Sequence, residues 1–409
     1  RRWPWYAGAI VVCALGMGVK ETMATAPIVA IAFDRIFLAR SWRVLVRRRG
    51  WVYLGLCLTW PVMVGAHLAS GDPSESAGFG YREITPLRYL LSQPAVLLHY
   101  LRLAVWPHPL QVDYMWRGIT WVKQAVAPGA VVLALLGVTV WGLWRRPRLA
   151  FAGLWFFVIL GPTSSFMPIA DLAMEHRMYL PLAAPLALAV VGAVWGLRVA
   201  LPGRDGLRGV VGVGAVAALA LTFIILTRHR NTDYHDVEGF WRDVVAKAPH
   251  NHRGWKNLGV VLMRRGRIGE SAKAYRRAID AKPDYAPARR GYGKTLAALG
   301  RYRDALDQFA RAEEDGALDA ASHNNIAWIR ATAADPELRD PAIALSHSKR
   351  ALAMTPSPAP GILDTHAAAL AAAGRYEEAL ETAGEALELA RRQADAGLAA
   401  RIRNRMALY

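Results

Sequence analysis

Cysteine and charge are both scarce in this chain of 409 residues. The two cysteines, Cys13 and Cys57, lie within apolar runs, and no metal-ligand spacing occurs. Charged residues make up only 20% of the chain and hydrophobic residues 54%. The chain is therefore long enough for two domains and too apolar to be one ordinary soluble globule.

Acidic residues are the scarcer of the two charge signs, with 32 Asp and Glu against 50 Lys and Arg, a formal net charge of +18. Such an excess occurs in proteins that bind nucleic acid or anionic membranes and in the loops that orient membrane proteins. Here most basic residues form short clusters between apolar runs, which is typical of a membrane protein. In the last third of the chain the aromatic residues fall on periodic packing positions rather than beside basic clusters, so nothing there indicates a nucleic-acid reader.

Long apolar runs fill the first half of the chain. A helix that crosses the hydrocarbon layer needs about 20 mostly apolar residues. By this measure we predict about seven spans: 4–19, 23–38, 50–69, 125–144, 149–164, 179–197 and 209–227.

The positions of the basic residues predict the orientation of these spans, because loops rich in Lys and Arg face the cytoplasm. The cytoplasmic set contains Arg40, Arg43, Arg47, Arg48, Arg49, Arg145, Arg146, Arg148, Arg198, Arg204 and Arg208. The loops around 20–22, 70–124 and 164–178 would then lie outside, as would everything after the seventh span.

Residues 86–106 of the long outer loop are rich in Leu and aromatic residues but contain Pro94 and Arg102. This mixture favours a helix that lies in the membrane interface. The alternative is an eighth span, in which Pro94 and Arg102 would be costly and which would reverse the orientation of all that follows.

From about residue 228 the composition changes to Ala, Arg, Glu and Asp with a period near 34 residues. The first unit carries Trp255, Leu258, Gly259, Gly266, Tyr275, Ala278 and Pro283, the positions that define a tetratricopeptide repeat. Three further units carry Gly293, Gly300, Tyr302, Ala305, Phe309 and Ala312; Ala327, Ala344, Ala351 and Pro356; and Gly374, Tyr376, Ala379 and Ala386. The third is stretched by "ADPELRDP".

The sequence therefore predicts an all-α chain of two parts. Residues 1–227 form a polytopic helical membrane domain, and residues 252–409 form an α-solenoid of about four tetratricopeptide repeats. Residues 228–251 link the two and contain "FWRDVVAKAPHN", which resembles the second half of a degenerate repeat.

Three stretches, "GVKETMATAPIVAIAFD", "YLRLAVWPHPLQVDY" and "GPTSSFMPIADLAMEHRMYLP", carry a likeness to a known family. Together with the repeats, the chain resembles the membrane glycosyltransferases of the GT-C fold, similar to the transmembrane-and-tetratricopeptide-repeat O-mannosyltransferases and their bacterial relatives. The resemblance implies transfer of a hexose, often mannose, from a polyprenyl-phosphate carrier to a Ser or Thr hydroxyl of a protein.

The resemblance also implies a location and a departure from the family. We expect an integral protein of a bacterial inner membrane with the repeats on the periplasmic side. Family members carry an acidic catalytic pair in the first outer loop, and the chain, which opens on "RRWPWY", is expected to begin beyond it. The general base is therefore expected upstream of residue 1. No cofactor is identifiable, and the resemblance leaves room for a divalent metal.

We predict that the donor phosphate lies against Arg177, Glu175, Lys20 and Glu21. Arg177 would bind a phosphate through its guanidinium group, with Glu175 paired to it; the alternative is an Arg that anchors a helix end. Lys20 and Glu21 lie between two close spans, where charges are functional candidates; a salt-bridged hairpin tip is the alternative. His176 has the weakest case, because adjacent residues cannot all face one site.

Asp113, His108 and Tyr114 are candidates for supporting roles after the interfacial helix. Asp113 could orient the donor or a metal, or cap a helix. His108 is held between two prolines. Asp34 and Arg35 are interpreted as an ion pair at the cytoplasmic surface.

In the repeats, Asn257, Asn324 and Asn325 are candidates for contacts with the backbone of an acceptor peptide, although Asn at such positions also serves helix packing. An alternative function for the whole chain is a non-catalytic membrane scaffold whose repeats recruit a protein partner. In that case the polar outer residues serve packing alone.

Overall fold

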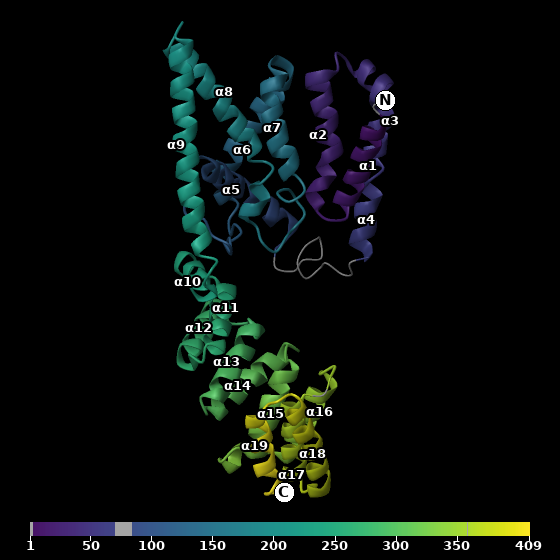
Figure 1. Cartoon of the computed structure of the whole chain (residues 1–409), viewed down its shortest axis with the longest axis vertical. Helices are drawn as coiled ribbons and strands as arrows, with labels where there is room; N and C mark the ends of the chain where they lie inside the picture. The colour runs from purple at the N-terminus through teal and green to yellow at the C-terminus, as the bar shows by residue number, and fades with distance from the viewer. Residues whose placement is uncertain (1–2, 70–83, 358) are drawn as a thin grey trace. The chain divides into compact units, whose positions relative to one another are not determined.

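The computed structural model describes residues 3–69, 84–357 and 359–409, and every regular element in these ranges is a helix. The all-α class that the sequence predicts is confirmed. The chain divides into two compact units, Arg1–Arg228 and His229–Tyr409. Figure 1 labels the helices of both. The division falls within the long helix α9 (Asp205–Thr232).

The first part of the first unit contains four α-helices and two short helical segments: α1 (Trp3–Met17), η1 (Glu21–Thr25), α2 (Ala26–Phe33), η2 (Asp34–Leu38), α3 (Trp42–Cys57) and α4 (Trp60–Ala69). The predicted span 50–69 is wrong as one helix, because α3 ends at Cys57 and α4 begins at Trp60. Pro61 explains the break, since it has no N–H to donate to the carbonyl of Cys57.

The start of α3 also differs from the prediction, because the basic residues from Arg43 to Arg49 lie in its first half and not in a loop. Ser41 begins the helix early by accepting a hydrogen bond from the backbone N–H of Val44 (3.3 Å).

The rest of the first unit contains α5 (Pro86–Val105), α6 (Lys123–Arg145), α7 (Pro147–Leu160), α8 (Ala183–Ala200) and α9. By length and composition, α6, α8 and α9 could cross a membrane, and their apolar surfaces are almost entirely exposed. Among the described helices, α1 and α7 are apolar but shorter.

The helix expected over 86–106 is α5, and it is seen nearly end-on in Figure 1, where α9 runs upright. Its buried face carries Tyr89, Val96 and Tyr100, which form one core with Phe156 and Leu160 of α7. Whether α5 lies in a membrane interface stays a prediction.

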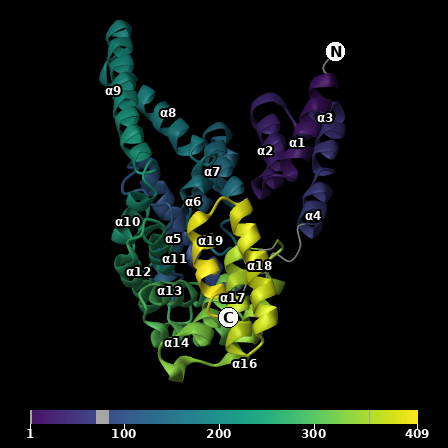
Figure 2. The same ribbon diagram turned by 60° about the horizontal axis from the view of Figure 1, so that its bottom comes forward.

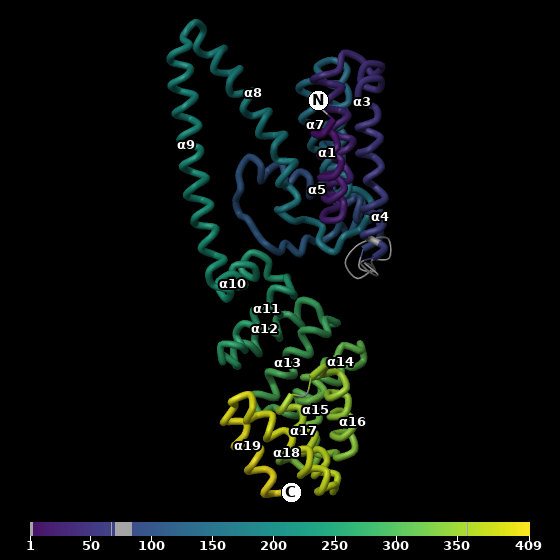
Figure 3. The backbone as a smooth tube through the Cα atoms, turned by 45° about the vertical axis from the view of Figure 1, so that its right-hand side comes forward, coloured from purple at the N-terminus to yellow at the C-terminus, as the bar shows by residue number. Residues whose placement is uncertain are grey.

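The second unit is a succession of helices: α10 (Val237–Lys247), α11 (His252–Arg264), α12 (Ile268–Ala281), α13 (Ala286–Ala298), α14 (Tyr302–Glu314), α15 (Ala320–Thr332), α16 (Pro341–Ala353), α17 (Pro360–Ala372), α18 (Tyr376–Arg392) and α19 (Ala396–Met406). From α11 to α18 they pack as consecutive pairs, with α10 against α11 and α19 against α18. Figures 2 and 3 show α17 and α18 side by side.

The small residues of the repeats let the two helices of a pair approach closely. A Cβ atom on Gly259 would lie 3.0 Å from the ring of Tyr275, and one on Gly293 would lie 2.7 Å from the ring of Phe309. Gly300, at the turn between α13 and α14, has a φ of 74°, which favours glycine. The predicted repeats are therefore confirmed.

The extra residues of the third repeat form a short 3-10 helix, Pro336–Leu338, between α15 and α16. The backbone N–H of Asp340 donates to the carbonyl of Arg330 (2.9 Å), which ties the insertion to α15. The insertion therefore lengthens the repeat without interrupting the succession of helices.

Candidate functional site

A cavity of about 540 Å³ in the first unit is lined by residues from two distant predicted motifs. Lys20 and Glu21 come from the turn after α1, and His176 and Arg177 come from the 3-10 helix Glu175–Met178 before α8. The apolar walls include Met23 and Ile159. The fold thus brings three of the four predicted donor-binding residues to one cavity.

Lys20 and Glu21 are both exposed at this cavity. Neither forms an ion pair or a side-chain hydrogen bond with any residue that the structure describes. The ammonium and carboxylate groups are therefore available to a ligand, and the alternative of a salt-bridged hairpin tip is wrong.

Arg177 is only 9% exposed, although it lines the cavity. Its guanidinium group donates to the carbonyls of Asp171 (2.7 Å), Leu172 (3.2 Å) and, more weakly, Thr163 (3.5 Å). Tyr89 donates to the same carbonyl of Thr163 (2.6 Å). Arg177 therefore holds the loop between α7 and α8 in shape, a role that sequence reasoning missed.

The predicted pairing of Glu175 with Arg177 is wrong. Glu175 Oε1 accepts hydrogen bonds from the backbone N–H of Gln111 and from the hydroxyl of Tyr114 (2.9 Å). Successive residues of a 3-10 helix point about 120° apart, so the side chains of Glu175, His176 and Arg177 diverge. Burial, followed by the charge of Glu175, raises the pKa of Tyr114, which keeps it a neutral donor.

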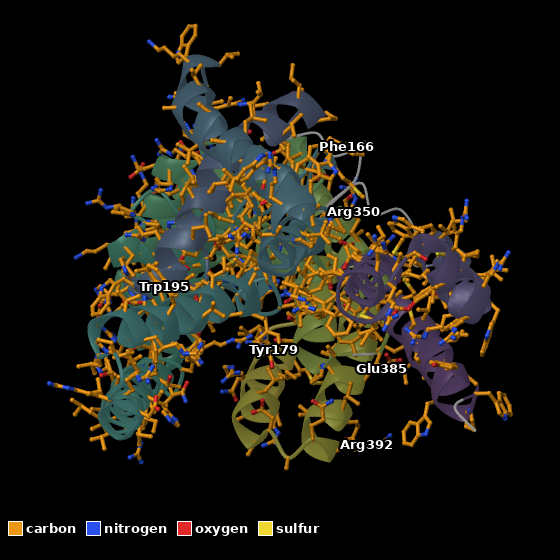
Figure 4. All side chains as sticks on the ribbon, turned by 90° about the horizontal axis from the view of Figure 1, so that it is seen from above. Phe166, Tyr179, Trp195, Arg350, Glu385 and Arg392 are labelled. Carbon is orange, nitrogen blue, oxygen red and sulfur yellow. The ribbon has the colours of Figure 1, made fainter. Side chains whose placement is uncertain are left out.

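His176 lines the cavity, contrary to its low rank from sequence. Its pKa is lowered by burial and then by the positive charges of Lys20 and Arg177. The imidazole can donate or accept a hydrogen bond in the cavity that Lys20 also lines. Tyr179, labelled in Figure 4, also borders the cavity. Its side chain is 84% exposed.

Asp113 and His108 lie in the loop after α5 and outside this cavity's lining. Asp113 Oδ1 accepts from the backbone N–H of Met115 (3.2 Å), a residue with a φ of 38°. Asp113 thus stabilises a turn and caps no helix, so the helix-cap alternative is wrong. His108 is exposed. Within the described ranges, no group of three or more His, Cys, Asp or Glu side chains is placed to hold a metal ion.

A second cavity, of about 640 Å³, adjoins the first and shares Thr22, Met23, Ile159 and Leu180 with it. It is largely apolar and also contacts Asp34, Arg49 and Tyr53. Buried Asp34 accepts hydrogen bonds from Arg49 and Tyr53 of α3.

The predicted ion pair of Asp34 with Arg35 is therefore wrong. These neighbours lie in a π-helical turn and point apart. The guanidinium of Arg35 instead lies 5.6 Å from the ring centre of Trp42.

The predicted peptide-contact residues of the second unit lie on first helices of the repeats, Asn257 on α11 and both Asn324 and Asn325 on α15. All three are partly exposed. The side-chain oxygen of Asn324 is buried and has no hydrogen-bond partner among the described residues.

One family model matches part of the second unit. A family model for the tetratricopeptide repeat matches residues 262–329. No curated protein sequence matches the chain.

Solved structures similar to the chain include two tetratricopeptide-repeat proteins and the Cut9–Hcn1 assembly. YrrB, described as having an unusual peptide-binding site, is 19% identical with a TM-score of 0.32, over 40% of this chain and 81% of that one. A tetratricopeptide-repeat protein of Thermus thermophilus is 20% identical with a TM-score of 0.33, over 47% of this chain and 97% of that one. The Cut9–Hcn1 hetero-tetramer of the APC/C is 13% identical with a TM-score of 0.34, over 95% of this chain and 89% of that one.

Proposed function

We propose that the chain is a membrane-anchored scaffold whose tetratricopeptide repeats bind a protein or peptide. The observation that carries this proposal is the succession of helix pairs from α11 to α18, matched by the repeat family model over 262–329. Such solenoids use an extended surface of successive repeats for binding. The unsatisfied amide oxygen of Asn324 supports a peptide contact on that surface.

A photo-crosslinking residue placed at Asn324 of the membrane-embedded chain tests this function. The same residue at exposed Arg277 of α12 serves as the control. One discrete crosslinked protein from position 324, absent from position 277, is the expected result. Equal crosslinking from both positions would overturn the scaffold.

Anchoring in a membrane is supported by the exposed apolar surfaces of α6, α8 and α9. A soluble protein rarely exposes apolar patches of that size. The family resemblance suggests a bacterial inner membrane, and we propose from the distribution of Lys and Arg that the repeats lie on the periplasmic side. Reporter fusions at residues 48 and 300 should report opposite sides of the membrane, and the same side would refute this topology.

A second candidate function, favoured by the cavity at Lys20, is hexose transfer from a polyprenyl-phosphate carrier to a protein hydroxyl. Lys20, Arg177 and His176 line this cavity beside the carboxylate of Glu21, and the two cationic side chains suit an anionic headgroup. The adjoining apolar cavity supports a lipid-linked ligand. In this function the repeats present the acceptor protein.

Lys20→Gln separates the two functions, because Lys20 is exposed and holds no other residue in place. Transfer from radiolabelled polyprenyl-phosphate mannose by the full-length protein should fall at least tenfold in this variant if the cavity binds the phosphate. Lys123→Gln, at the exposed start of α6, is the control. If the unmodified protein transfers no mannose, only the scaffold function remains.

A further inference from the structure

The α6–α8 groove is a cavity of about 420 Å³ in the first unit, between the helices α6, α7 and α8. Its lining is mainly apolar and includes Val138 of α6, Phe156 of α7 and Leu188 of α8. Figures 1 and 3 show α8 diverging from α7 toward its C-terminal end. Cavities of about 300–1,000 Å³ are the size that holds small molecules.

The floor of the groove consists of small residues at which α6 and α7 pack closely. A Cβ atom on Gly142 would lie 3.0 Å from Cβ of Ala150, and one on Gly153 would lie 2.3 Å from Oγ1 of Thr139. This hydroxyl already donates to the carbonyl of Leu135 (2.8 Å). The floor therefore suits an apolar ligand rather than a polar one.

The groove lies on a surface that the proposed anchoring places in the membrane. Both α6 and α8 are long and apolar enough to cross a membrane, and their surfaces are almost entirely exposed. The bilayer core supplies no water to fill an opening between such helices, whereas its lipid chains are as apolar as a leucine side chain. A lipid acyl chain is therefore the ligand that suits the groove.

One end of the groove carries positive charge that no carboxylate neutralises. Arg146 lines the groove, and Arg145 and Arg148 adjoin it at the turn from α6 to α7. All three are exposed, and none forms an ion pair with a residue that the structure describes. The sequence contains no Asp or Glu between Asp113 and Asp171, so neither helix supplies a counter-charge. Guanidinium groups bind phosphate oxygens through their paired N–H donors.

Two tryptophans place this end of the groove at the level of the lipid headgroups. Trp141 lines the groove, Trp144 follows it one turn later, and both are exposed. Exposed tryptophans gather where the hydrocarbon layer meets the headgroups. The arginines that follow Trp144 are therefore expected at the depth of the lipid phosphates.

This charged end is distinct from the cavity at Lys20. Helix α7 begins at Pro147, next to Arg146, and its residue Ile159 near the other end lines the cavity at Lys20. The 14 residues of α7 span about 20 Å at the usual helical rise. A phosphate bound at Arg146 would therefore belong to a different ligand from a sugar donor at Lys20.

We propose that the α6–α8 groove binds one anionic phospholipid of the surrounding membrane, with an acyl chain along the floor and the phosphate at Arg146. Arg145 and Arg148 add to the attraction for an anionic headgroup. The bound lipid fills the space between α7 and α8 and so joins α8 to the rest of the first unit. This inference rests on the proposed anchoring in a membrane and adds a specific lipid to it.

Native mass spectrometry of the full chain, released from detergent micelles, tests this assignment. The probes are phosphatidylglycerol, which is anionic, and phosphatidylcholine, which is zwitterionic, with the same acyl chains. We expect the first molecule of phosphatidylglycerol to bind at least about fivefold more tightly, because a basic residue at a membrane surface favours an anionic lipid by about that factor.

Two matched pairs of variants locate the site. Arg146→Gln should reduce the preference for phosphatidylglycerol about fivefold, whereas Arg117→Gln, at an exposed position in the loop before α6, should leave it unchanged. Leu188→Trp, which fills the groove, should abolish retention of the first phosphatidylglycerol. Val190→Trp, at an exposed position of α8 outside the lining, should retain it. The melting temperature of each variant in detergent checks that it stays folded.

The outcomes separate this inference from the anchoring on which it rests. Equal affinity for the two lipids, or equal effects of Arg146→Gln and Arg117→Gln, would overturn the anionic site and leave the anchoring intact. Equal effects of Leu188→Trp and Val190→Trp would overturn the acyl chain in the groove. Release of the chain from membranes by alkaline carbonate would overturn the proposed anchoring as well.

Two other occupants of the groove would be recognised in the same experiment. A dimer of the chain that Leu188→Trp disrupts would show that a second copy covers the groove. Displacement of phosphatidylglycerol by polyprenyl phosphate would assign the groove to the sugar donor. Either result would overturn the phospholipid as the ligand.

Discussion

The hydroxyl of Tyr114 lies 2.9 Å from Oε1 of Glu175, a residue 61 positions later in the chain. The same oxygen accepts the backbone N–H of Gln111. One carboxylate thus fastens the loop after α5 to the 3-10 helix that carries His176 and Arg177.

Replacing Glu175 by Gln should destabilise the first unit by about 1–3 kcal/mol, because hydrogen bonds to a charged acceptor are the stronger kind. Thermal unfolding in detergent measures the loss. In a double-mutant cycle with Tyr114→Phe, the free energy of unfolding of the double variant should fall by less than the sum of the falls in the two single variants. Strict additivity would show that the contact contributes nothing.

Arg177→Lys should lower the melting temperature of the first unit, because an ammonium group cannot reproduce the planar donors that reach the carbonyls of Asp171 and Leu172. We expect a loss of about 1–3 kcal/mol, as for a buried polar group left unsatisfied. Lys20→Gln should leave the melting temperature unchanged. If both variants melt like the unmodified protein, Arg177 does not hold the loop.

Gly291→Ala should destabilise the repeats by about 1–3 kcal/mol through overpacking. A Cβ atom at residue 291 would lie 2.2 Å from Cε1 of the buried Tyr275 ring. Gly269→Ala is the matched control, since its Cβ would meet nothing within 4 Å. Urea unfolding should therefore separate the two variants, and a common midpoint would contradict the close packing.

Asp319 should make the stability of the repeats fall in acid. Burial raises its pKa, but hydrogen bonds from Lys294 and Ser322 outweigh burial and lower it to about 2. The pKa of an unfolded Asp is about 3.9, so the folded state favours the ionised form. Its stabilising contribution is complete above about pH 5 and is lost as the pH falls toward 2.

Urea unfolding at pH 7 and pH 3 measures this contribution. Asp319→Asn should be less stable at pH 7, because it keeps the cap of α15 but loses the ion pair with Lys294, and should show a smaller difference between the two pH values. Asp315→Asn, at an exposed position nearby, should show the same difference in stability between pH 7 and pH 3 as the unmodified protein. The same difference in both variants would assign the acid sensitivity to other carboxylates.

The repeats were predictable because their packing positions require particular residues. Gly259 and Gly293 face aromatic rings that leave little or no room for a Cβ, so glycine at these positions signals the close contact. The membrane part was less predictable, since composition marks an apolar run but not where it breaks. Pro61 was the local signal that separated α3 from α4.

Side-chain partners in the candidate site could not be predicted from proximity in sequence. Glu175 and Arg177 are two residues apart, yet the 3-10 turn directs them to different neighbours. Asp34 likewise bonds Arg49 on the next helix rather than adjacent Arg35. Local helix type and tertiary packing decide these contacts, and neither follows from residue identity alone.

Because each helix pair from α11 to α18 contacts mainly its neighbours in sequence, the second unit behaves as a one-dimensional array. Its cooperativity resides in the surfaces between adjacent pairs, so melting can begin at a terminus and travel inward. The last described helix of the array, α19, packs mainly against α18. Amide hydrogen exchange should therefore slow progressively from α19 toward the interior of the stack.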